Sequence, residues 1–216
     1  KDRRRDQTRS YPSIVLFQNQ WLESQTHVHP IVPALLWIPI AVYLLWRGVA
    51  VHGLNLVQLA SIGAVALLTW TLTEYVLHRY VFHFEAESQA GQWLGYLMHG
   101  LHHDDPADPT RLVMPPAASL ILAALIYPFF RAALGPVWID PFFGVFLFGY
   151  LSYDYIHYYT HHFSPTTRVG KFLKQSHMIH HYTNSNERFG VSSPLWDYAL
   201  GTAGAPRPKA AQFAGR

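Results

Sequence analysis

The sequence predicts an all-α integral membrane protein with about four transmembrane helices. Half of its 216 residues are apolar and only 13% are charged, which departs from the composition of ordinary soluble domains. Aromatic residues make up 15% of the chain, as is typical where amphipathic rings lie at membrane surfaces. The apolar residues are also concentrated in long runs, and this arrangement favours membrane crossings over a soluble helical core.

Four apolar runs are the candidate membrane helices: residues 31–46, 54–77, 116–135 and 137–156. The first run is short, so we expect it to extend toward Val28 and to tilt in the membrane. The second has about 24 residues and a single charge, so it is long enough to cross a hydrocarbon core of about 30 Å. The last two runs are separated by Gly135-Pro136, a turn signal that predicts a helical hairpin.

Four crossings would place both termini on one side of the membrane, and the basic residues indicate which side. Of the 16 Lys and Arg residues, only Arg47 and Arg131 belong to the other side. By the positive-inside rule, the termini and the loop 78–115 are expected in the cytoplasm. The predicted organisation is a cytosolic segment at 1–27, a membrane domain with a cap at 28–202, and a flexible tail at 203–216.

The composition also excludes several classes of site. The chain has no Cys, which excludes disulfide frameworks, thiolate zinc sites, iron–sulfur clusters and Cys nucleophiles. The basic residues lie at the ends of apolar runs and not on one aromatic-rich surface, which argues against nucleic-acid binding. No cleavable signal peptide is expected, because the N-terminus is basic and polar for about a dozen residues. Because the chain has no Cys and has 14 His, any metal would be held by nitrogen.

Eleven of the 14 His fall in four tight clusters, at residues 78–83, 99–103, 157–162 and 177–181. In each half of the chain, a pair at the end of a predicted span is followed sixteen residues later by a His-x-x-His-His group. Two repeats of five His make ten donors, and because about four to six donors satisfy one transition metal, ten suit two ions. The predicted fold is therefore a four-helix membrane domain whose cytosolic helical cap holds a His-rich dinuclear metal site.

Helical spacing indicates how the clusters present their imidazoles. His157 and His161 share a helix face, whereas His162 diverges and is expected to support a ligand without binding metal. His78 and His83, five residues apart, cannot point the same way on one straight helix, so they either serve different metals or straddle a helix end. The three His of each His-x-x-His-His group share one broad face, so the two groups form a chelating surface.

Outside the clusters, a few residues are expected to act on the ligands or to be structural. Glu74 and Asp154 precede the two span-end clusters and either orient imidazole N–H groups or are ordinary interfacial carboxylates. His27, His29 and His52 have no cluster partner and are expected to be structural. Neutral nitrogen donors suit iron, copper or zinc; a redox reaction favours iron, and zinc could occupy the site in purified protein.

The clusters, together with Tyr153-Asp154-x-x-His157-Tyr158 and Phe189-Gly190-Val191-x-Ser193-Pro194-Leu195-Trp196-Asp197, resemble the fatty acid hydroxylase and sterol desaturase superfamily over roughly residues 70–202. The stretch HGLHHDDPADPTRLVMPP at 99–116 is similar to the fatty acid 2-hydroxylase subgroup. The resemblance implies four transmembrane helices, a cytosolic cap with a dinuclear metal centre, and oxygen insertion at the carbon next to an acyl carboxyl group. It implies ten metal ligands and no other catalytic residue: His78, His83, His99, His102, His103, His157, His161, His177, His180 and His181.

The resemblance also implies the reaction partners. These are O2, a lipid or fatty acyl substrate, and an electron donor. Eukaryotic members of the family commonly carry a fused cytochrome b5 domain, and no haem-binding motif of that kind is visible here. The donor is therefore expected to be a separate protein, cytochrome b5-like or ferredoxin-like. The same absence favours a bacterial inner membrane over the endoplasmic reticulum. Arg111 either anchors a substrate headgroup or is one more cytoplasmic positive charge. The alternatives are sterol or carotenoid oxidation or desaturation in the same superfamily, and a membrane metal transporter or storage protein, which would need polar ligands at mid-membrane depth.

Overall fold

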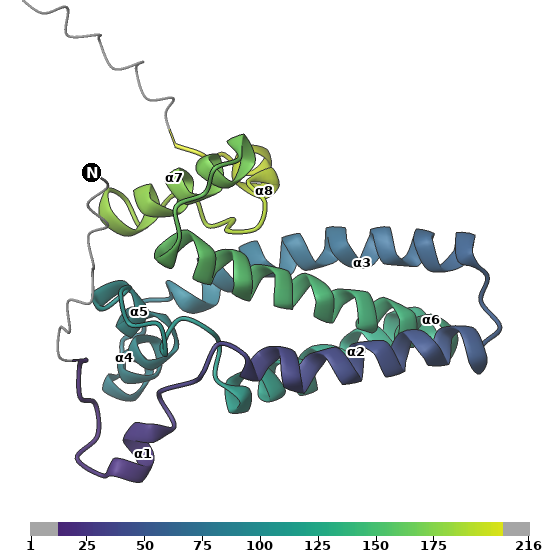
Figure 1. Ribbon diagram of the computed structural model, residues 1–216, viewed down its shortest axis with the longest axis horizontal. Helices are drawn as coiled ribbons and strands as arrows, with labels where there is room; N and C mark the ends of the chain where they lie inside the picture. Colours follow the sequence, from purple (N-terminus) through teal and green to yellow (C-terminus); the bar gives the residue numbers. More distant parts are fainter. Residues whose placement is uncertain (1–12, 205–216) are drawn as a thin grey trace, which may run out of the picture.

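The computed structural model describes residues 13–204, and within this range the chain is all-helical without a β-strand. The N-terminal part has α1 (Gln20–Ser24), α2 (Val32–Ala50) and α3 (Leu56–Leu77), which continues into the π-helical turn η1 (His78–Phe82). The other helices are α4 (Gln89–Gly95), η2 (Tyr96–Gly100), α5 (Leu101–Asp104), α6 (Pro116–His162), α7 (Arg168–Tyr182) and α8 (Leu195–Ala199). Figure 1 shows α2, α3 and α6 in one bundle with the shorter helices gathered at one end. Segments 1–12 and 205–216, which include most of the predicted flexible tail, lie outside the described residues.

Among the described residues, three helices are long and apolar enough to cross a membrane: α2, α3 with η1, and α6. α6 has 47 residues, or about 70 Å of helix, more than twice a hydrocarbon core of about 30 Å. Its backbone turns at Gly135 (φ 73°), and Pro136 follows, so that two arms fold back on each other. Across the arms, the ring centroids of Tyr127 and Phe143 are 5.0 Å apart. The predicted hairpin is therefore confirmed, while the number of membrane crossings stays a prediction.

The first apolar helix begins and ends later than expected. α2 starts at Val32, with Pro33 in its first turn, where a missing N–H costs no helical hydrogen bond. The expected extension toward Val28 is wrong, because the Val28 N–H donates to the Thr110 carbonyl instead (2.6 Å). The helix gains its length at the other end, where it runs on to Ala50.

The second arm of α6 packs against both α2 and α3 and carries most of the bundle core. Trp70 of α3 meets Phe146 edge to face with ring centroids 5.1 Å apart, and Trp37 of α2 meets Tyr150 at 6.3 Å. On the outer surface, apolar side chains remain uncovered, as at Leu35, which is 68% exposed. Apolar side chains face outward where lipid is the solvent, and the chain is accordingly a multi-pass membrane protein.

The close approach of Gly149 to Trp70 gives a test of this core. A Cβ at Gly149 would lie 2.5 Å from Cγ of Trp70, whereas a Cβ at Gly63 would lie 3.6 Å from the Val145 side chain. We expect Gly149→Ala to lower the unfolding temperature in detergent, by the equivalent of roughly 1–3 kcal/mol. Gly63→Ala is the matched control and should keep or raise that temperature, since Ala favours helix by about 1 kcal/mol. Equal unfolding temperatures for the two variants would contradict this packing.

Candidate metal centre

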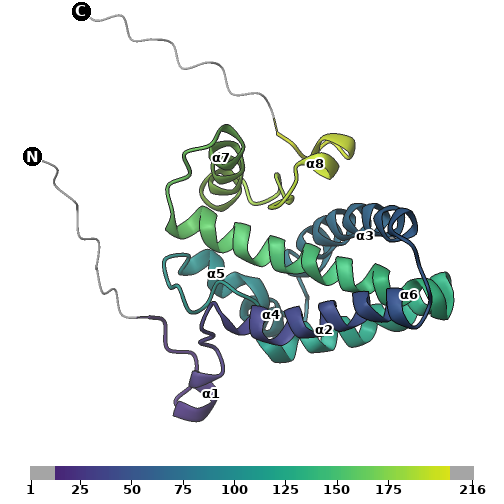
Figure 2. The same cartoon turned by 45° about the vertical axis from the view of Figure 1, so that its right-hand side comes forward.

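Ten imidazoles gather at the end of the bundle, where α6 meets the short helices. In both Figure 1 and Figure 2, this end of α6 lies between α7 and α8 on one side and α4 and α5 on the other. The imidazoles form two groups, and in each group one nitrogen per ring lies within 4.8 Å of the others. The first imidazole group is His78, His83, His99, His103 and His180, and the second is His102, His157, His161, His177 and His181. These are the ten predicted ligands; the structure brings them together, and their binding of metal stays a prediction.

The π-helical turn η1 explains how His78 and His83 reach the same group. The His83 N–H donates to the His78 carbonyl across five residues (3.2 Å), and this wider turn brings residues five apart onto one side of the helix. Their ring centroids are 5.1 Å apart. The pair therefore lies in one imidazole group at a helix end, which favours a shared metal over two different ones.

Each His-x-x-His-His segment contributes to both groups. In the 99–103 segment, the two His that are four residues apart enter the first group, and His102 enters the second. In the 177–181 segment the assignment is reversed, and only His180 enters the first group. The broad helical face expected for these segments therefore faces the boundary between the two groups.

Backbone carbonyls determine which nitrogen of two imidazoles carries the proton. Nδ1 of His78 lies 2.5 Å from the Phe189 carbonyl oxygen, and Nδ1 of His180 lies 2.7 Å from the Glu187 carbonyl oxygen. A carbonyl only accepts, so each Nδ1 donates and each Nε2 is left with a free lone pair. This is the arrangement of a His that binds a metal through Nε2.

The converging Nε2 atoms fit a transition metal. Nε2 of His99 lies 3.1 Å from that of His78 and 3.0 Å from that of His103, so three ring nitrogens face one another. In the second group, the Nε2 atoms of His161 and His177 are 2.8 Å apart. Metal–nitrogen bonds of about 2.1 Å place neighbouring ligand nitrogens about 3 Å apart. Five nitrogen donors in each group are thus compatible with iron, copper or zinc.

Burial keeps these imidazoles neutral. It lowers the pKa of His83 and His103 to about 4 and the pKa of His180 to about 3. Burial, with the neighbouring imidazoles adding to it, also holds the pKa of His99 and His102 well below the usual value. All five rings are therefore neutral at neutral pH, as imidazole ligands must be.

Two buried carboxylates hold the segment 189–192, which carries the carbonyl that faces His78. The Asp197 carboxylate accepts from the N–H groups of Phe189 and the next residue (2.9 and 2.8 Å). Oε1 of Glu74 accepts from the following two N–H groups (2.7 and 2.8 Å). Glu74 thus acts on His78 through the backbone of this segment and not by direct contact.

Asp154 contacts the wall of a cavity and not an imidazole. Its Oδ2 accepts from the Tyr150 hydroxyl (2.8 Å), and its Oδ1 lies 3.3 Å from the Met114 N–H. Among residues 13–204, neither Asp154 nor Glu74 makes the direct imidazole hydrogen bond that was one of the two expectations. Both are also buried inside the protein, and the other expectation, of ordinary interfacial carboxylates, stays a prediction.

Sequence reasoning missed three supporting groups: the carbonyls of Phe189 and Glu187, and the Asp197 carboxylate. A carbonyl carries no residue-type signal, because every residue has one. Asp197 lies eight residues after Phe189, and only the family resemblance of the 189–197 segment marked it.

The other singled-out His lie outside both groups. The His162 ring packs on Tyr158 with centroids 4.7 Å apart, and its expected supporting role stays a prediction. Nε2 of His52 lies 3.1 Å from Oδ2 of Asp140. The three His without cluster partners are absent from the two groups, in line with their expected structural roles: His27, His29 and His52.

Arg111 is buried and bound by protein groups. Its guanidinium donates to Oε1 of Glu23 (2.5 Å) and to the Ile14 carbonyl (2.6 Å). Its side chain is 2% exposed, so its charge is paired within the protein; the alternative of one more cytoplasmic positive charge stays a prediction. Arg111 fastens part of the N-terminal segment onto the cap, and its role as a headgroup anchor stays a prediction.

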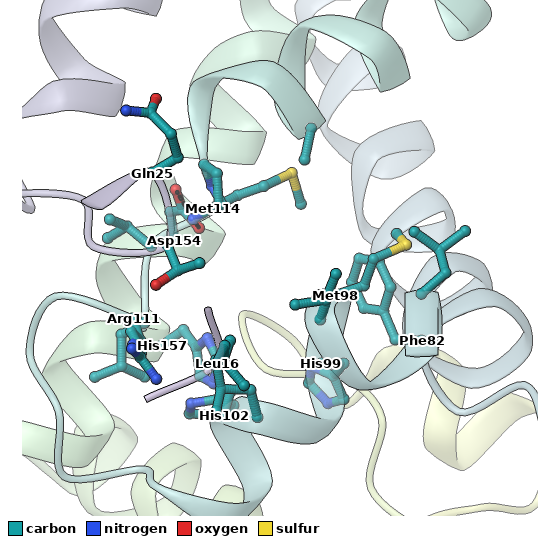
Figure 3. Close-up of a pocket in the computed structure, with 18 of the residues that line it drawn as sticks. Leu16, Gln25, Phe82, Met98, His99, His102, Arg111, Met114, Asp154 and His157 are labelled. Atoms are coloured by element: carbon teal, nitrogen blue, oxygen red, sulfur yellow. Dashed lines mark hydrogen bonds between the residues drawn. The ribbon is translucent and has the colours of Figure 1, made fainter. Parts of the chain in front are cut away.

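A largely apolar cavity of about 360 Å³, here called the cap cavity, reaches both imidazole groups. His99 of the first group and His102 and His157 of the second line it. Figure 3 shows these three rings along one side and Gln25 on the opposite side. Leu16, from the N-terminal segment, supplies part of the wall. An apolar molecule in this cavity would have both imidazole groups within reach.

The lowered imidazole pKa values predict how stability depends on pH. An unfolded chain protonates its His near about pH 6.5, whereas His83 and His103 in the folded, metal-free protein resist protonation down to about pH 4. The unfolded state binds more protons in this window, so the stability is fully present above it and is lost as the pH falls. The unfolding temperature of chelator-treated protein in detergent should therefore fall across the window, less steeply in a His83→Gln/His103→Gln variant. A flat profile for the unchanged protein would contradict the burial of these rings.

Known proteins share this sequence over most of its length. Residues 63–202 match the family model described as fatty acid hydroxylase. A dihydroceramide fatty acyl 2-hydroxylase of Arabidopsis thaliana is 40% identical over 168 residues, which cover 78% of this chain and 70% of that protein. The ceramide very long chain fatty acid hydroxylase of Saccharomyces cerevisiae is 39% identical, over 88% of this chain and 49% of its own length. The fatty acid 2-hydroxylase of Homo sapiens is 29% identical, over 90% of this chain and 58% of its own.

The fold is shared as well. The solved structure of full-length scs7p, in which only the hydroxylase domain is visible, matches with a TM-score of 0.83 and 37% identity. The match covers 89% of this chain and 73% of that one. The family model covers all ten imidazoles of the two groups. This chain therefore belongs to the fatty acid hydroxylase family, whose members are oxidoreductases that hydroxylate fatty acids.

Proposed function

We propose that this protein hydroxylates carbon 2 of a fatty acyl chain, with O2 as the oxidant. The observation that carries the proposal is the apolar cap cavity that reaches both imidazole groups. An acyl chain requires an apolar binding cavity, and its oxidation requires a redox centre beside that cavity. The plant and human relatives are named as 2-hydroxylases, which supports attack at the carbon next to the acyl carbonyl.

In this proposal, each imidazole group holds one metal ion, and iron is the ion expected for activity. Zinc could bind the same nitrogens in purified protein, since both metals accept imidazole ligands. The bound pair would supply O2 activation, which amino-acid side chains do not provide. The protein's own part is to place C2 beside His99, His102 and His157 and to exclude water with the apolar wall.

The proposed reaction is a balanced monooxygenation. One C–H bond at C2 breaks and one C–O bond forms, so that one oxygen atom of O2 enters the product. The other oxygen atom leaves as water, which consumes two electrons and two protons. We propose a separate donor of the cytochrome b5 or ferredoxin class for the electrons.

The substrate is proposed to be a free fatty acid or the acyl chain of a sphingolipid. The plant relative acts by name on dihydroceramide and the yeast relative on ceramide. The sterol and carotenoid alternatives have no support among these names. The transporter and storage alternative is set aside because the family is one of hydroxylases.

The imidazole groups are proposed to lie on the cytoplasmic side. Of the eight Lys and Arg residues within 13–204, only Arg47 and Arg131 belong to the opposite end of the bundle, which supports this orientation by the positive-inside rule. The relatives compared above are eukaryotic and give no support to the bacterial inner membrane favoured from sequence alone. A membrane of a eukaryotic cell is therefore as compatible with the chain as a bacterial one.

The proposal is tested by profiling lipids from cells that express the protein with iron and a competent electron donor. We expect 2-hydroxy acyl chains from the wild type, and a loss of more than about 100-fold in His102→Ala, because His102 is one of five donors in the second group. His29→Ala is the matched control and should retain product, because His29 is exposed and outside both groups. Mass spectrometry of the hydrolysed acyl chains gives the ratio of 2-hydroxy product in each variant to that in the wild type.

Two results would count against the proposal. The first is a folded, metal-loaded wild type that yields no 2-hydroxy product although the donor is active. The second is a His102→Ala variant that yields as much product as the wild type.

A further inference from the structure

A second, smaller cavity lies inside the helix bundle. Its volume is about 40 Å³, and it is here called the bundle cavity. It is bounded by α2, α3 and both arms of α6, through side chains that include Trp37, Trp70, Ala123 and Phe146. The Ser119 hydroxyl in its wall already accepts a hydrogen bond from Trp37 (3.1 Å). Most of its other lining side chains are apolar or aromatic, so the bundle cavity suits a hydrocarbon.

Met114 is the one residue within 13–204 that lines both cavities. Its backbone is held, since its N–H faces the Asp154 carboxylate (3.3 Å). Its side chain is partly buried against the core, and a Met side chain is unbranched, with three rotatable bonds. Figure 3 shows Met114 on the side of the cap cavity away from His99 and His102. Its thioether is thus a movable part of the wall between the two cavities.

The neighbouring part of that wall is fixed. Tyr150 lines the bundle cavity and Asp154 lines the cap cavity, and the Tyr150 hydroxyl donates to Asp154 (2.8 Å). Asp154 is 1% exposed and Tyr150 is 5% exposed, so the pair is locked between the cavities. A path between the cavities would therefore run past Met114 and not past this pair.

We propose that Met114 sets the acyl chain length that the enzyme accepts, by controlling passage from the cap cavity to the bundle cavity. This inference rests on the proposed function. The cap cavity, at about 360 Å³, is near the small end of the 300–1,000 Å³ that is roughly typical of ligand cavities. With C2 held at the imidazoles, a longer chain passes the Met114 side chain and places its methyl end among the aromatic rings of the bundle. Each further methylene buried there favours binding by roughly fourfold.

Competition among acyl chains tests this proposal. Cells expressing the full chain receive an equimolar mixture of medium, long and very long saturated fatty acids, and mass spectrometry quantifies each 2-hydroxy product. Met114→Ala widens the passage and should raise the ratio of very long to medium products by about tenfold, the effect of roughly two buried methylenes. Met114→Phe narrows the passage and should lower the same ratio by a similar factor.

Ala123→Leu provides an independent variant. Ala123 lines the bundle cavity only, so the added side chain fills that cavity and alters no residue that lines the cap cavity. It should lower the ratio as Met114→Phe does, and in a double variant it should cancel the gain from Met114→Ala. If Met114→Phe fails to fold, the Met114→Ala and Ala123→Leu ratios decide the question.

The proposal is overturned if the wild type makes 2-hydroxy products and both Met114→Ala and Ala123→Leu keep its chain-length distribution. In that case the tail leaves the cap cavity toward lipid and not through the bundle. A wild type without any 2-hydroxy product would overturn the proposed function itself, and this inference with it.

Discussion

Neutral imidazoles whose Nε2 atoms face one another at about 3 Å form the arrangement on which the rest of this structure depends. Lone pairs repel at that distance unless a cation or a shared proton lies between them. The Nδ1–H groups of His78 and His180 donate to carbonyls, so their Nε2 atoms carry lone pairs. Burial also lowers the pKa of rings such as His83 and His103 to about 4, which disfavours the second proton of an imidazolium. In the proposed function, a metal ion in each group would resolve the repulsion, and the surrounding protein holds the ten rings together. His78 shows how far this support reaches: the Phe189 carbonyl orients its ring, and the Glu74 and Asp197 carboxylates hold the segment that carries that carbonyl.

The membrane helices deliver these rings from distant parts of the chain. α3 and the second arm of α6 end at the same place, because the hairpin at Gly135 returns the chain to the end of the bundle from which α6 began. α3 with its η1 turn and α6 thus bring one His pair each, and the cap segments supply the rest. In the first pair, the two His are five residues apart and would point to different faces of an α-helix. The π-helical turn η1 brings them to the same side. π turns are rare and occur mainly at functional sites, which agrees with the place of η1 in the first imidazole group.

The sequence predicted much of this arrangement, and the reasons for its failures are physical. Hydropathy and the Gly135-Pro136 turn predicted the helices and the hairpin, because lipid imposes strong constraints on composition. Spacing predicted ten donors in two sets of five. Spacing could not assign the ten His to the two imidazole groups, because each His-x-x-His-His segment contributes to both groups. That assignment depends on how α5 and α7 face each other. The Phe189 carbonyl and the Met114 position between two cavities could not be predicted either, since both arise from tertiary packing.

The central claim is that each imidazole group binds one metal ion, and metal counting tests it most directly. The wild type and two double variants, His83→Ala/His103→Ala in the first group and His161→Ala/His181→Ala in the second, would be purified in detergent and analysed by elemental mass spectrometry. This account predicts two transition-metal ions for each wild-type chain and one for each chain of either folded double variant. A folded wild type that holds no transition metal, or double variants that hold as much as the wild type, would contradict it.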